Sequence, residues 1–363
     1  MDLDSIKEIL RTFAEVEARG VSPLYEHLAL QAAEDDDVAG LLASARDGEV
    51  RATLLMATAH RLVQADPIHP LSRYYPSLGG FDGVDSETWP LFRSFLLERA
   101  DKARSLISSR YTQTNEVRRA ALLYPGVARA AKEAGGKISL LEVGCSAGLL
   151  LGLDRFGYRY QCDGGEQLTA GPAKTPVGLH CALDLAPGAV APKLPKKLSV
   201  LDRAGLDRAP VDLSDEDELA WLEACVWADQ PDRIRLLRTA AAEQAKHRPR
   251  FITGDGVDDL PSAAASLEGR LVVVTSHALA YFAAPRRAEF VASLAELAAS
   301  RPLWWVSEEF YGAGLETVLP GRSDLVGDGL ATLGVVRWED GKAEAHALAR
   351  TAPHGQRMTW LPL

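Results

Sequence analysis

The feature that most constrains this sequence is a change of hydrophobic periodicity near residue 137. Up to about residue 135, apolar residues recur at helical spacing, as in SIKEILRTFAEVEARG, and no convincing strand is present. Beyond residue 137, short apolar strands alternate with helices, a pattern typical of a parallel α/β sheet. The predicted strands are 138–143, 157–162, 250–253, 270–275 and 302–307. The sequence therefore predicts an α-helical N-terminal cap domain over residues 1–110 and an α/β domain over residues 111–363.

Two further segments belong to the predicted α/β domain. Residues 164–249 are expected to form an insertion between the second and third strands, with a helical later part that starts at Pro231. Near the end of the sequence, extended segments flank Asp340 and Gly341, a dipeptide that favours a hairpin turn. We therefore expect an antiparallel pair of strands at one edge of the sheet.

The first predicted strand leads into a turn that contains glycine. Glu142 lies in the strand, Gly144 to Gly148 form the turn, and residues 149–153 are expected to be helical. Glycine allows close backbone approach, and the free N–H groups at a helix start attract carboxylates and phosphates. Ser146 stands where the dinucleotide fingerprint has its second glycine, which disfavours a cofactor for hydride transfer. A tight turn without a ligand is the alternative that this stretch leaves open.

Composition and charge narrow the classes of partner. The formal net charge of −10 argues against nucleic acid, because phosphate contacts require clustered Lys and Arg. No apolar run is long enough to cross a membrane, and the acidic start MDLDSIKEILRTF lacks the basic region of a signal peptide. The four cysteines include no C-x-x-C pair, which indicates reduced thiols and opposes a metal site. We expect a cytoplasmic protein with a small-molecule substrate, no nucleic-acid partner and no membrane association.

Polar residues follow the predicted strands at the ends where ligands bind in open α/β sheets. These residues are Glu142, Asp163, Asp255, the pair Ser276 and His277, and the run from Ser307 to Glu309. Asp163 follows the second strand, a position suited to hydrogen bonds with ribose hydroxyls. Each residue alone is explained equally well by a turn or a core position. Their recurrence along one edge predicts a ligand site.

Several motifs resemble known families. The pattern from Glu142 to Gly148, E-x-G-x-S-x-G, is similar to the first motif of class I S-adenosylmethionine-dependent methyltransferases. The stretches YYPSLGG, QTNEVRRAALL, EVGCSAGLLLGLDRFGY, RAGLDRAPVDLSDEDELAWLEACVWADQPDR, HALAYF and APHG resemble a bacterial, mostly actinobacterial, family of unknown function. That family is itself regarded as methyltransferase-like, and the resemblance spans roughly residues 70–360. It implies a Rossmann-like sheet with an antiparallel C-terminal hairpin. The family usually has Asn where this chain has Leu150.

The resemblance also implies site residues. For S-adenosylmethionine binding they are Thr114, Asn115, Glu116, Arg119, Glu142, Gly144, Ser146, Gly148, Asp163 and Asp255. Thr114 or Asn115 would also suit the N-cap of a helix, which is the structural alternative for that stretch. His354, in the P-H-G match, becomes a catalytic candidate beside His277 and Glu309, any of which could deprotonate a methyl acceptor.

The leading hypothesis is a class I methyltransferase-like enzyme with S-adenosylmethionine as its cofactor. The stretch SHAL after the fourth strand replaces an N-P-P-Y-like tetrad, which disfavours methylation of adenine or glutamine amino groups and favours a small-molecule acceptor. A second hypothesis keeps the fold but assigns the pocket another nucleotide-like ligand and non-methylating chemistry. A third is a sheet that binds a metabolite or a protein partner without turnover.

Overall fold

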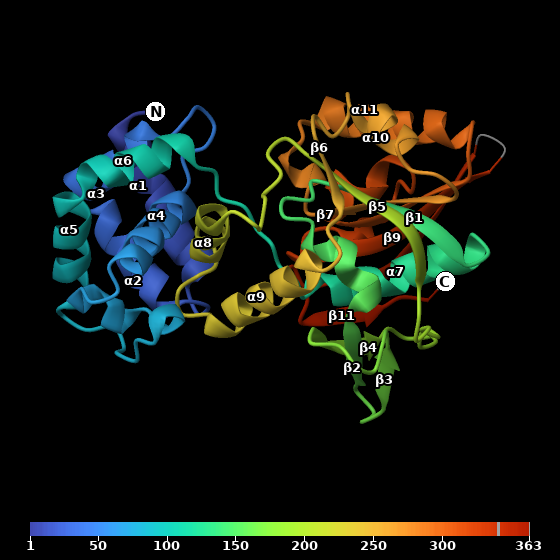
Figure 1. Cartoon of the computed structure of the whole chain (residues 1–363), viewed down its shortest axis with the longest axis horizontal. Helices are drawn as coiled ribbons and strands as arrows, with labels where there is room; N and C mark the ends of the chain where they lie inside the picture. Colours follow the sequence, from blue (N-terminus) through green and yellow to red (C-terminus); the bar gives the residue numbers. More distant parts are fainter. Residues whose placement is uncertain (340–341, 363) are drawn as a thin grey trace. The chain divides into compact units, whose positions relative to one another are not determined.

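The protein, described here by a computed structural model over residues 1–339 and 342–362, divides into two compact units (Figure 1). Unit 1 comprises Met1–Thr114 and Leu213–Leu237, and unit 2 comprises Asn115–Asp212 and Arg238–Leu363. The helical segment predicted for residues 1–110 lies in unit 1. Residues 213–237, which the sequence analysis assigned to the insertion in the α/β domain, group with this helical unit instead.

Unit 1 is built from helices. Its elements are α1 (Leu3–Thr12), the π-helix η1 (Phe13–Ala18), α2 (Pro23–Ala33), α3 (Asp36–Leu41), η2 (Leu42–Ser44), α4 (Ala52–Ala65), η3 (Pro70–Tyr74), η4 (Pro76–Leu78), α5 (Thr88–Glu98), α6 (Ala100–Ser109), α8 (Glu216–Ala224) and the first part of α9 (Pro231–Ala245). The side chains of Asp2, Ser22 and Asp35 accept hydrogen bonds from backbone N–H groups in the first turns of α1, α2 and α3. These caps satisfy donors that a helix start leaves unpaired.

The core of unit 1 joins its two sequence segments. Trp221 and Ala228, from the second segment, belong to the same buried apolar cluster as residues of α1 to α6. His60 of α4 is fully buried, with Nδ1 3.1 Å from the carbonyl oxygen of Ala224 and Nε2 2.8 Å from the hydroxyl of Ser77. The helical unit is therefore completed only by residues that lie far along the chain.

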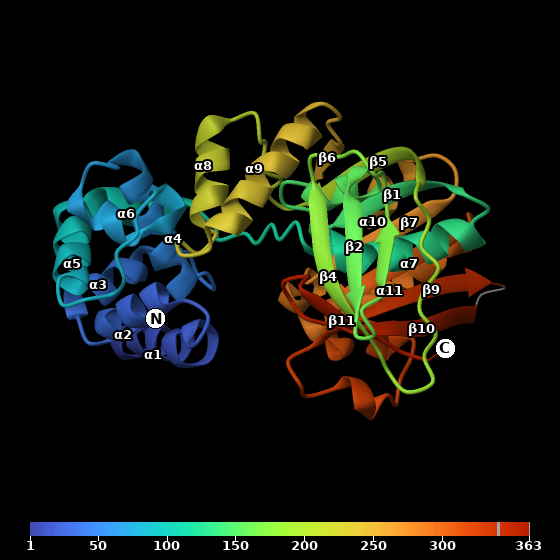
Figure 2. The ribbon, with the colours of Figure 1, turned by 90° about the horizontal axis from the view of Figure 1, so that it is seen from below.

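Unit 2 contains one sheet of eleven strands, seen from two directions in Figures 1 and 2. In chain order the strands are β1 (Lys137–Val143), β2 (Gly157–Cys162), β3 (Gln167–Ala170), β4 (Gly178–Leu185), β5 (Ser199–Asp207), β6 (Arg250–Thr253), β7 (Leu271–Ser276), β8 (Leu303–Glu309), β9 (Ala331–Glu339), β10 (Lys342–Thr351) and β11 (Arg357–Trp360). Their spatial order is β3-β2-β4-β11-β10-β9-β8-β7-β1-β5-β6. The neighbours β6, β5, β1, β7 and β8 are mutually parallel, whereas β8, β9, β10 and β11 pair in antiparallel fashion.

The expected α/β class with a large sheet is confirmed, and all five predicted strands are present. Three details of the prediction are wrong. The segment 164–249 is not a simple insertion, because it contains β5, the parallel neighbour of β1. Consequently β2 is not next to β1 but lies on the far side of the sheet order. The predicted turn at Asp340 and Gly341 lies outside the described residues; the strands on either side of it form the expected antiparallel pair, but they lie inside the sheet, between β8 and β11, and not at its edge.

Helices cover both faces of the parallel region. Trp305 of β8 packs edge to face against Phe290 of α11 (Ala284–Ala298), which lies beside α10 (Leu260–Ala265). Val306, the next residue, faces α7 (Arg119–Glu133), where a Cβ added to Gly126 would lie 2.8 Å from the Val306 side chain. Because successive strand residues point to opposite faces, each strand end offers polar groups to two different environments.

The remaining elements of unit 2 are short. They are η5 (Leu149–Arg155), η6 (Leu279–Tyr281), η7 (Tyr311–Ala313), η8 (Leu315–Thr317) and η9 (Ser323–Leu325), all 3₁₀-helices. The turn after β1 thus leads into a helical segment as expected, and that segment is a 3₁₀-helix. No helix in the described ranges 1–339 and 342–362 combines the length and apolar character that a membrane crossing requires.

Candidate functional site

The turn after β1 is closed by side chains from two other segments. Gly144, Ser146 and Gly148 all have positive φ, at 75°, 49° and 63°. The backbone N–H of Ser146 donates to Asp207 (2.7 Å), and that of Ala147 donates to Asn115 (3.3 Å). The Asn115 amide also donates to the hydroxyl of Ser146 (2.6 Å). A left-handed conformation at a non-glycine residue costs free energy, so these bonds hold Ser146 in a strained turn.

The two glycines of this turn are explained by close packing. A Cβ on Gly144 would lie 2.4 Å from the Cβ of Ala278, and a Cβ on Gly148 would lie 2.8 Å from the ring of Phe251. Protein atoms therefore occupy the space that the missing side chains leave. The glycine pattern alone does not indicate a ligand, as the tight-turn alternative in the sequence analysis allowed.

Glu142 is a buried carboxyl group beside this turn. Its side chain is 4 % exposed, and Oε2 has no hydrogen-bond partner among the described residues. Burial, and next the charge of Asp207, raises the pKa of Glu142 well above its ordinary value. The protonated carboxyl can donate a hydrogen bond, so Glu142 presents an unused polar group next to the end of β1.

Asp207 occupies the position at which the sequence analysis placed Asp163. It ends β5, the strand next to β1, and its second oxygen accepts a hydrogen bond from the N–H of Ala209 (2.9 Å). Asp163 instead follows β2, which is separated from β1 by six other strands. β5 is not evident from hydrophobic periodicity, because Asp202 and Arg203 interrupt its apolar pattern. The alternation of Val200, Ala204 and Leu206 was the available signal.

Asp255 is engaged by two arginines. Its Oδ2 accepts from Arg208 (2.6 Å) and its Oδ1 from Arg286 (2.6 Å). Oδ1 also accepts from the N–H groups of Val257 and Asp258. Although burial opposes ionisation, these partners lower the pKa of Asp255 below its ordinary value. This carboxylate is thus fully used within the protein, which fits a structural role better than ligand binding.

A second polar group forms where β7 and β8 end. Glu308 is completely buried, yet its Oε2 accepts from the hydroxyl of Ser276 (2.7 Å) and its Oε1 from that of Thr351 (2.8 Å). The ring atom Nε2 of His277 lies 3.4 Å from the same Oε1. Burial alone would raise the pKa of Glu308, but His277, Arg119 and Ser276 together lower it below its ordinary value. Glu308 is therefore held as a carboxylate.

Glu309, the next residue, has the opposite environment. It points to the other face of the sheet, where Oε1 accepts from the N–H groups of Ala278 (2.9 Å) and Leu279 (3.1 Å). Its Oε2 is buried and has no hydrogen-bond partner among the described residues. Burial raises the pKa of Glu309 to about 7. Adjacent residues of one strand thus supply a stable carboxylate and a carboxyl group that titrates near neutrality.

His277 lies between these carboxyl groups in a strained conformation. Its φ is 51°, and its backbone N–H donates to the carbonyl oxygen of Glu308 (3.0 Å). The ring packs edge-on against Phe310 at 5.2 Å, and its side chain is 11 % exposed. A non-glycine residue at positive φ persists only where its surroundings enforce it, and such residues concentrate at functional sites.

The segment before α7 and the end of β10 reach the same edge. The side chains of Glu116 and His354 approach each other, with Oε2 and Nδ1 3.9 Å apart, and form an ion pair when the imidazole is protonated. Arg119 donates from Nε to the carbonyl oxygen of Pro353 (2.8 Å) and contributes to lowering the pKa of Glu308. The predicted helix cap is wrong: α7 starts at Arg119, and Asn115 binds Ser146 rather than a helix N–H. Thr114 is the last residue of the first segment of unit 1 and is exposed.

The structure therefore gathers most of the predicted site residues at the carboxyl edge of unit 2. We call this set the carboxyl-edge site and define it by the residues Asn115, Glu116, Arg119, Glu142, Ser146, Asp207, Ser276, His277, Glu308, Glu309, Thr351 and His354. Neighbouring carboxyl groups whose environments drive their pKa values apart are the arrangement that general acid–base chemistry uses. Within the described part of the chain, no group of three or more His, Cys, Asp and Glu side chains is arranged to hold a metal ion.

Comparison with known proteins yields one family. The family described as "Uncharacterized protein conserved in bacteria (DUF2332)" matches residues 7–360, which is nearly the whole chain. A search of curated proteins found no match.

Proposed function

The protein belongs to the DUF2332 family, and from the geometry of its carboxyl-edge site we propose that it is an S-adenosylmethionine-dependent methyltransferase acting on a small molecule. The observation that carries this proposal is the parallel order β6-β5-β1-β7-β8, which brings acids and a strained histidine to one edge. This order supports the Rossmann-like, methyltransferase-type assignment, because ligands of open α/β sheets bind beyond the carboxyl ends of the strands.

Two acids fit the role of holding the cofactor. Glu142 offers its unpartnered Oε2 beside the turn, and Asp207 carries a carboxylate at the end of the adjacent strand. When bound, the sulfonium group would supply an activated methyl group. The task of the protein is then to orient the acceptor and exclude water, which the burial of Glu308 and Glu309 favours.

His277 is the residue best placed to remove a proton from the acceptor. Its Nε2 has no hydrogen-bond partner among the described residues and lies near the carboxylate of Glu308, which stabilises an imidazolium electrostatically. Ser276, Thr351 and Arg119 hold that carboxylate in its ionised form. Glu309, with a pKa of about 7, can take or return a proton on the other face of β8. His354 is tied to Glu116, which gives it a positioning role at the rim.

The test is calorimetric titration of the full-length protein with S-adenosylhomocysteine. We expect saturable binding that weakens at least about 10-fold in Glu142→Leu, because the variant loses one polar contact worth roughly 1.4 kcal/mol. Glu142→Gln keeps a donor of the same shape and should bind nearly as the native protein does. Removing an unpartnered buried carboxyl is not expected to unfold the chain.

Two results would count against the proposal. A folded protein that fails to bind S-adenosylhomocysteine near millimolar concentration would overturn the cofactor. The closed turn and the packed glycines would then be explained as architecture alone, and the edge would bind a different ligand or none. Binding that is equally strong in Glu142→Leu would show that the cofactor contacts other residues.

A further inference from the structure

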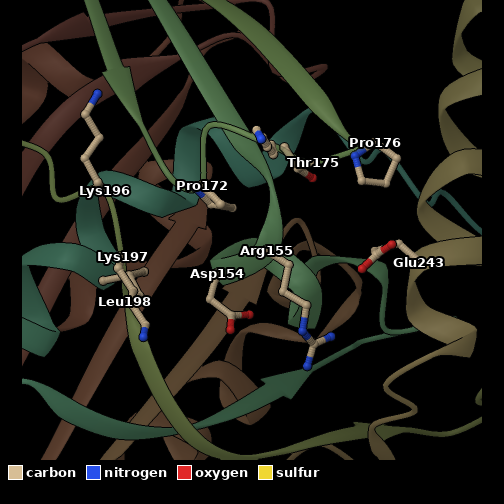
Figure 3. A pocket seen from close by; sticks show the side chains of 10 residues that line it. Asp154, Arg155, Pro172, Thr175, Pro176, Lys196, Lys197, Leu198 and Glu243 are labelled. Carbon is tan, nitrogen blue, oxygen red and sulfur yellow. The ribbon is translucent and has the colours of Figure 1, made fainter.

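Unit 2 contains a cavity apart from the carboxyl-edge site. Its volume is about 400 Å³, within the range of small-molecule sites. The walls come from η5, from the two loops that precede β4 and β5, and from α9 (Figure 3). The lining residues are Asp154, Arg155, Pro172, Lys174, Thr175, Pro176, Lys196, Lys197, Leu198 and Glu243. None of these residues belongs to the carboxyl-edge site.

The lining is basic in a protein that is acidic as a whole. Four of the lining residues carry a positive charge, whereas the chain has a formal net charge of −10. The two acids of the lining are already used. Both oxygens of Asp154 accept from the guanidinium of Arg203, at 2.7 and 3.1 Å, and Glu243 pairs with Lys246 at 2.8 Å.

Three of the cations are left without such partners. Arg155, Lys174 and Lys197 make no hydrogen bond or ion pair within the part of the chain that the structure describes. Arg155 is the most informative, because its guanidinium is partly buried and lies beside that of Arg203. Asp154 and Glu243 also act on Arg155, each less strongly than Arg203 does. With four cations against two acids, the lining keeps an excess of positive charge, which favours an anion as its ligand.

We propose that this cavity binds a small metabolite that carries a phosphate group. Arg155 comes from η5, Lys174 and Thr175 from one loop, and Lys197 from another, so the donors belong to different walls of the cavity. In Figure 3, Arg155, Thr175 and Lys197 lie on separate segments around it. A phosphate offers three acceptor oxygens in a tetrahedral arrangement, which suits donors on several walls better than a planar carboxylate does. The volume leaves room for an organic body beside the phosphate.

The loop that carries Lys174 is well ordered for this role. Pro172 and Pro176 restrict its backbone, which lowers the entropy lost when a ligand is bound. The hydroxyl oxygen of Thr175 accepts from the N–H of Val177 (3.2 Å), so its hydrogen is directed elsewhere and can be donated to an anion. The ammonium group of Lys196 donates a hydrogen bond to the carbonyl oxygen of Thr169 (2.7 Å), so the proposed binding does not require it.

The experiment is calorimetric titration of the full-length protein with pyrophosphate and adenosine monophosphate, with citrate as the carboxylate comparison. We expect saturable binding of at least one phosphate compound, with an affinity that falls as salt is added. Arg155→Gln combined with Lys197→Gln should lower that affinity at least 10-fold. The matched control is Lys193→Gln, an exposed residue of the same loop that does not line the cavity and should change affinity less than 2-fold.

Each other outcome overturns the proposal. Absence of binding below about 1 mM would exclude a phosphate site of useful affinity, since that limit corresponds to only about 4 kcal/mol. Equal losses in Lys193→Gln and the double variant would indicate adventitious attraction to surface charge. Binding of citrate alone would exclude the phosphate assignment. None of these results depends on S-adenosylhomocysteine, so the proposed function stands or fails separately.

Discussion

The two units differ most in the charge that they bury. Among the buried Asp, Glu, Lys, Arg and His residues, unit 1 has only His60 and Glu223. Unit 2 buries six such groups, namely Glu116, Arg119, Glu142, Glu308, Glu309 and Arg350. Burying a charge is costly unless it is paired, and a domain of this size has ample apolar residues for its core. The difference indicates that unit 2, which keeps charged groups buried at a cost in stability, carries the functional residues.

The position of these charges sharpens the contrast. Five of the six lie at the carboxyl edge, and Arg350 lies next to it, donating to the hydroxyl of Thr332 (2.6 Å) and pairing with Asp328. Unit 1, in contrast, has a continuous apolar core with buried aromatic residues such as Tyr75 and Phe95. Perturbed titratable groups that cluster at strand ends are a physical reason to locate function in unit 2.

The largest expected effect is that of Glu308→Ala. It leaves Ser276, Thr351 and Arg119 without their buried acceptor, which should lower the free energy of unfolding of unit 2 by about 3–5 kcal/mol. Hydrogen exchange in urea gives the free energy of unfolding of each unit separately, from peptides of β8 for unit 2 and from peptides of α1 for unit 1. Glu344→Ala, an exposed site on β10, should stay within about 0.5 kcal/mol. A small effect of Glu308→Ala would mean that the buried network contributes little.

The next effect concerns Glu309 and pH. Because its folded pKa is raised to about 7 from an ordinary value of 4.5, the folded state keeps a proton that the unfolded state loses as pH rises. Its contribution to stability should therefore fall by roughly 2.5 kcal/mol between pH 5 and pH 8. Glu309→Gln should remove that slope in peptides of β8. An unchanged slope in the variant would assign the pH dependence to another group.

His60 should give unit 1 the opposite pH dependence. Burial lowers the pKa of His60 to about 4, so below pH 6.5 the unfolded state takes up a proton that the folded state refuses. Between pH 7 and pH 5 the unit should lose roughly 2 kcal/mol of stability. His60→Gln should flatten this dependence, read by hydrogen exchange in α4. An unchanged pH dependence of α4 in His60→Gln would assign the loss of stability to another group.

Sequence reasoning found the architecture more readily than the site geometry. The strands β1, β7 and β8 are continuous apolar runs, so their pattern alone located them. β5 carries Asp202 and Arg203, whose partners Arg250 and Asp154 come from distant segments, and local hydrophobicity could not reveal it. Without β5, the acid at the neighbouring strand end was assigned to Asp163 instead of Asp207.

The roles of individual side chains were the hardest to predict. Asparagine is a common residue at helix N-caps, so the sequence suggested that role for Asn115. Only the folded chain shows that its amide donates a hydrogen bond to Ser146 in the turn after β1. The opposite environments of Glu308 and Glu309 likewise depend on which helices cover each face of the sheet. His277 was selected from its place at a strand end, but its positive φ is a property of the tertiary structure.

The composition of unit 1 from two separated segments has a consequence for protein synthesis. Its core needs Trp221 and Ala228, and its buried His60 needs the carbonyl group of Ala224. A ribosome adds roughly 5–20 residues per second, so the first helices wait several seconds for these partners to emerge. During that time β1 and β5 of unit 2 have already been made. The amino-terminal region is thus translated first but cannot finish folding first, and its exposed apolar surface is a point at which a chaperone would assist.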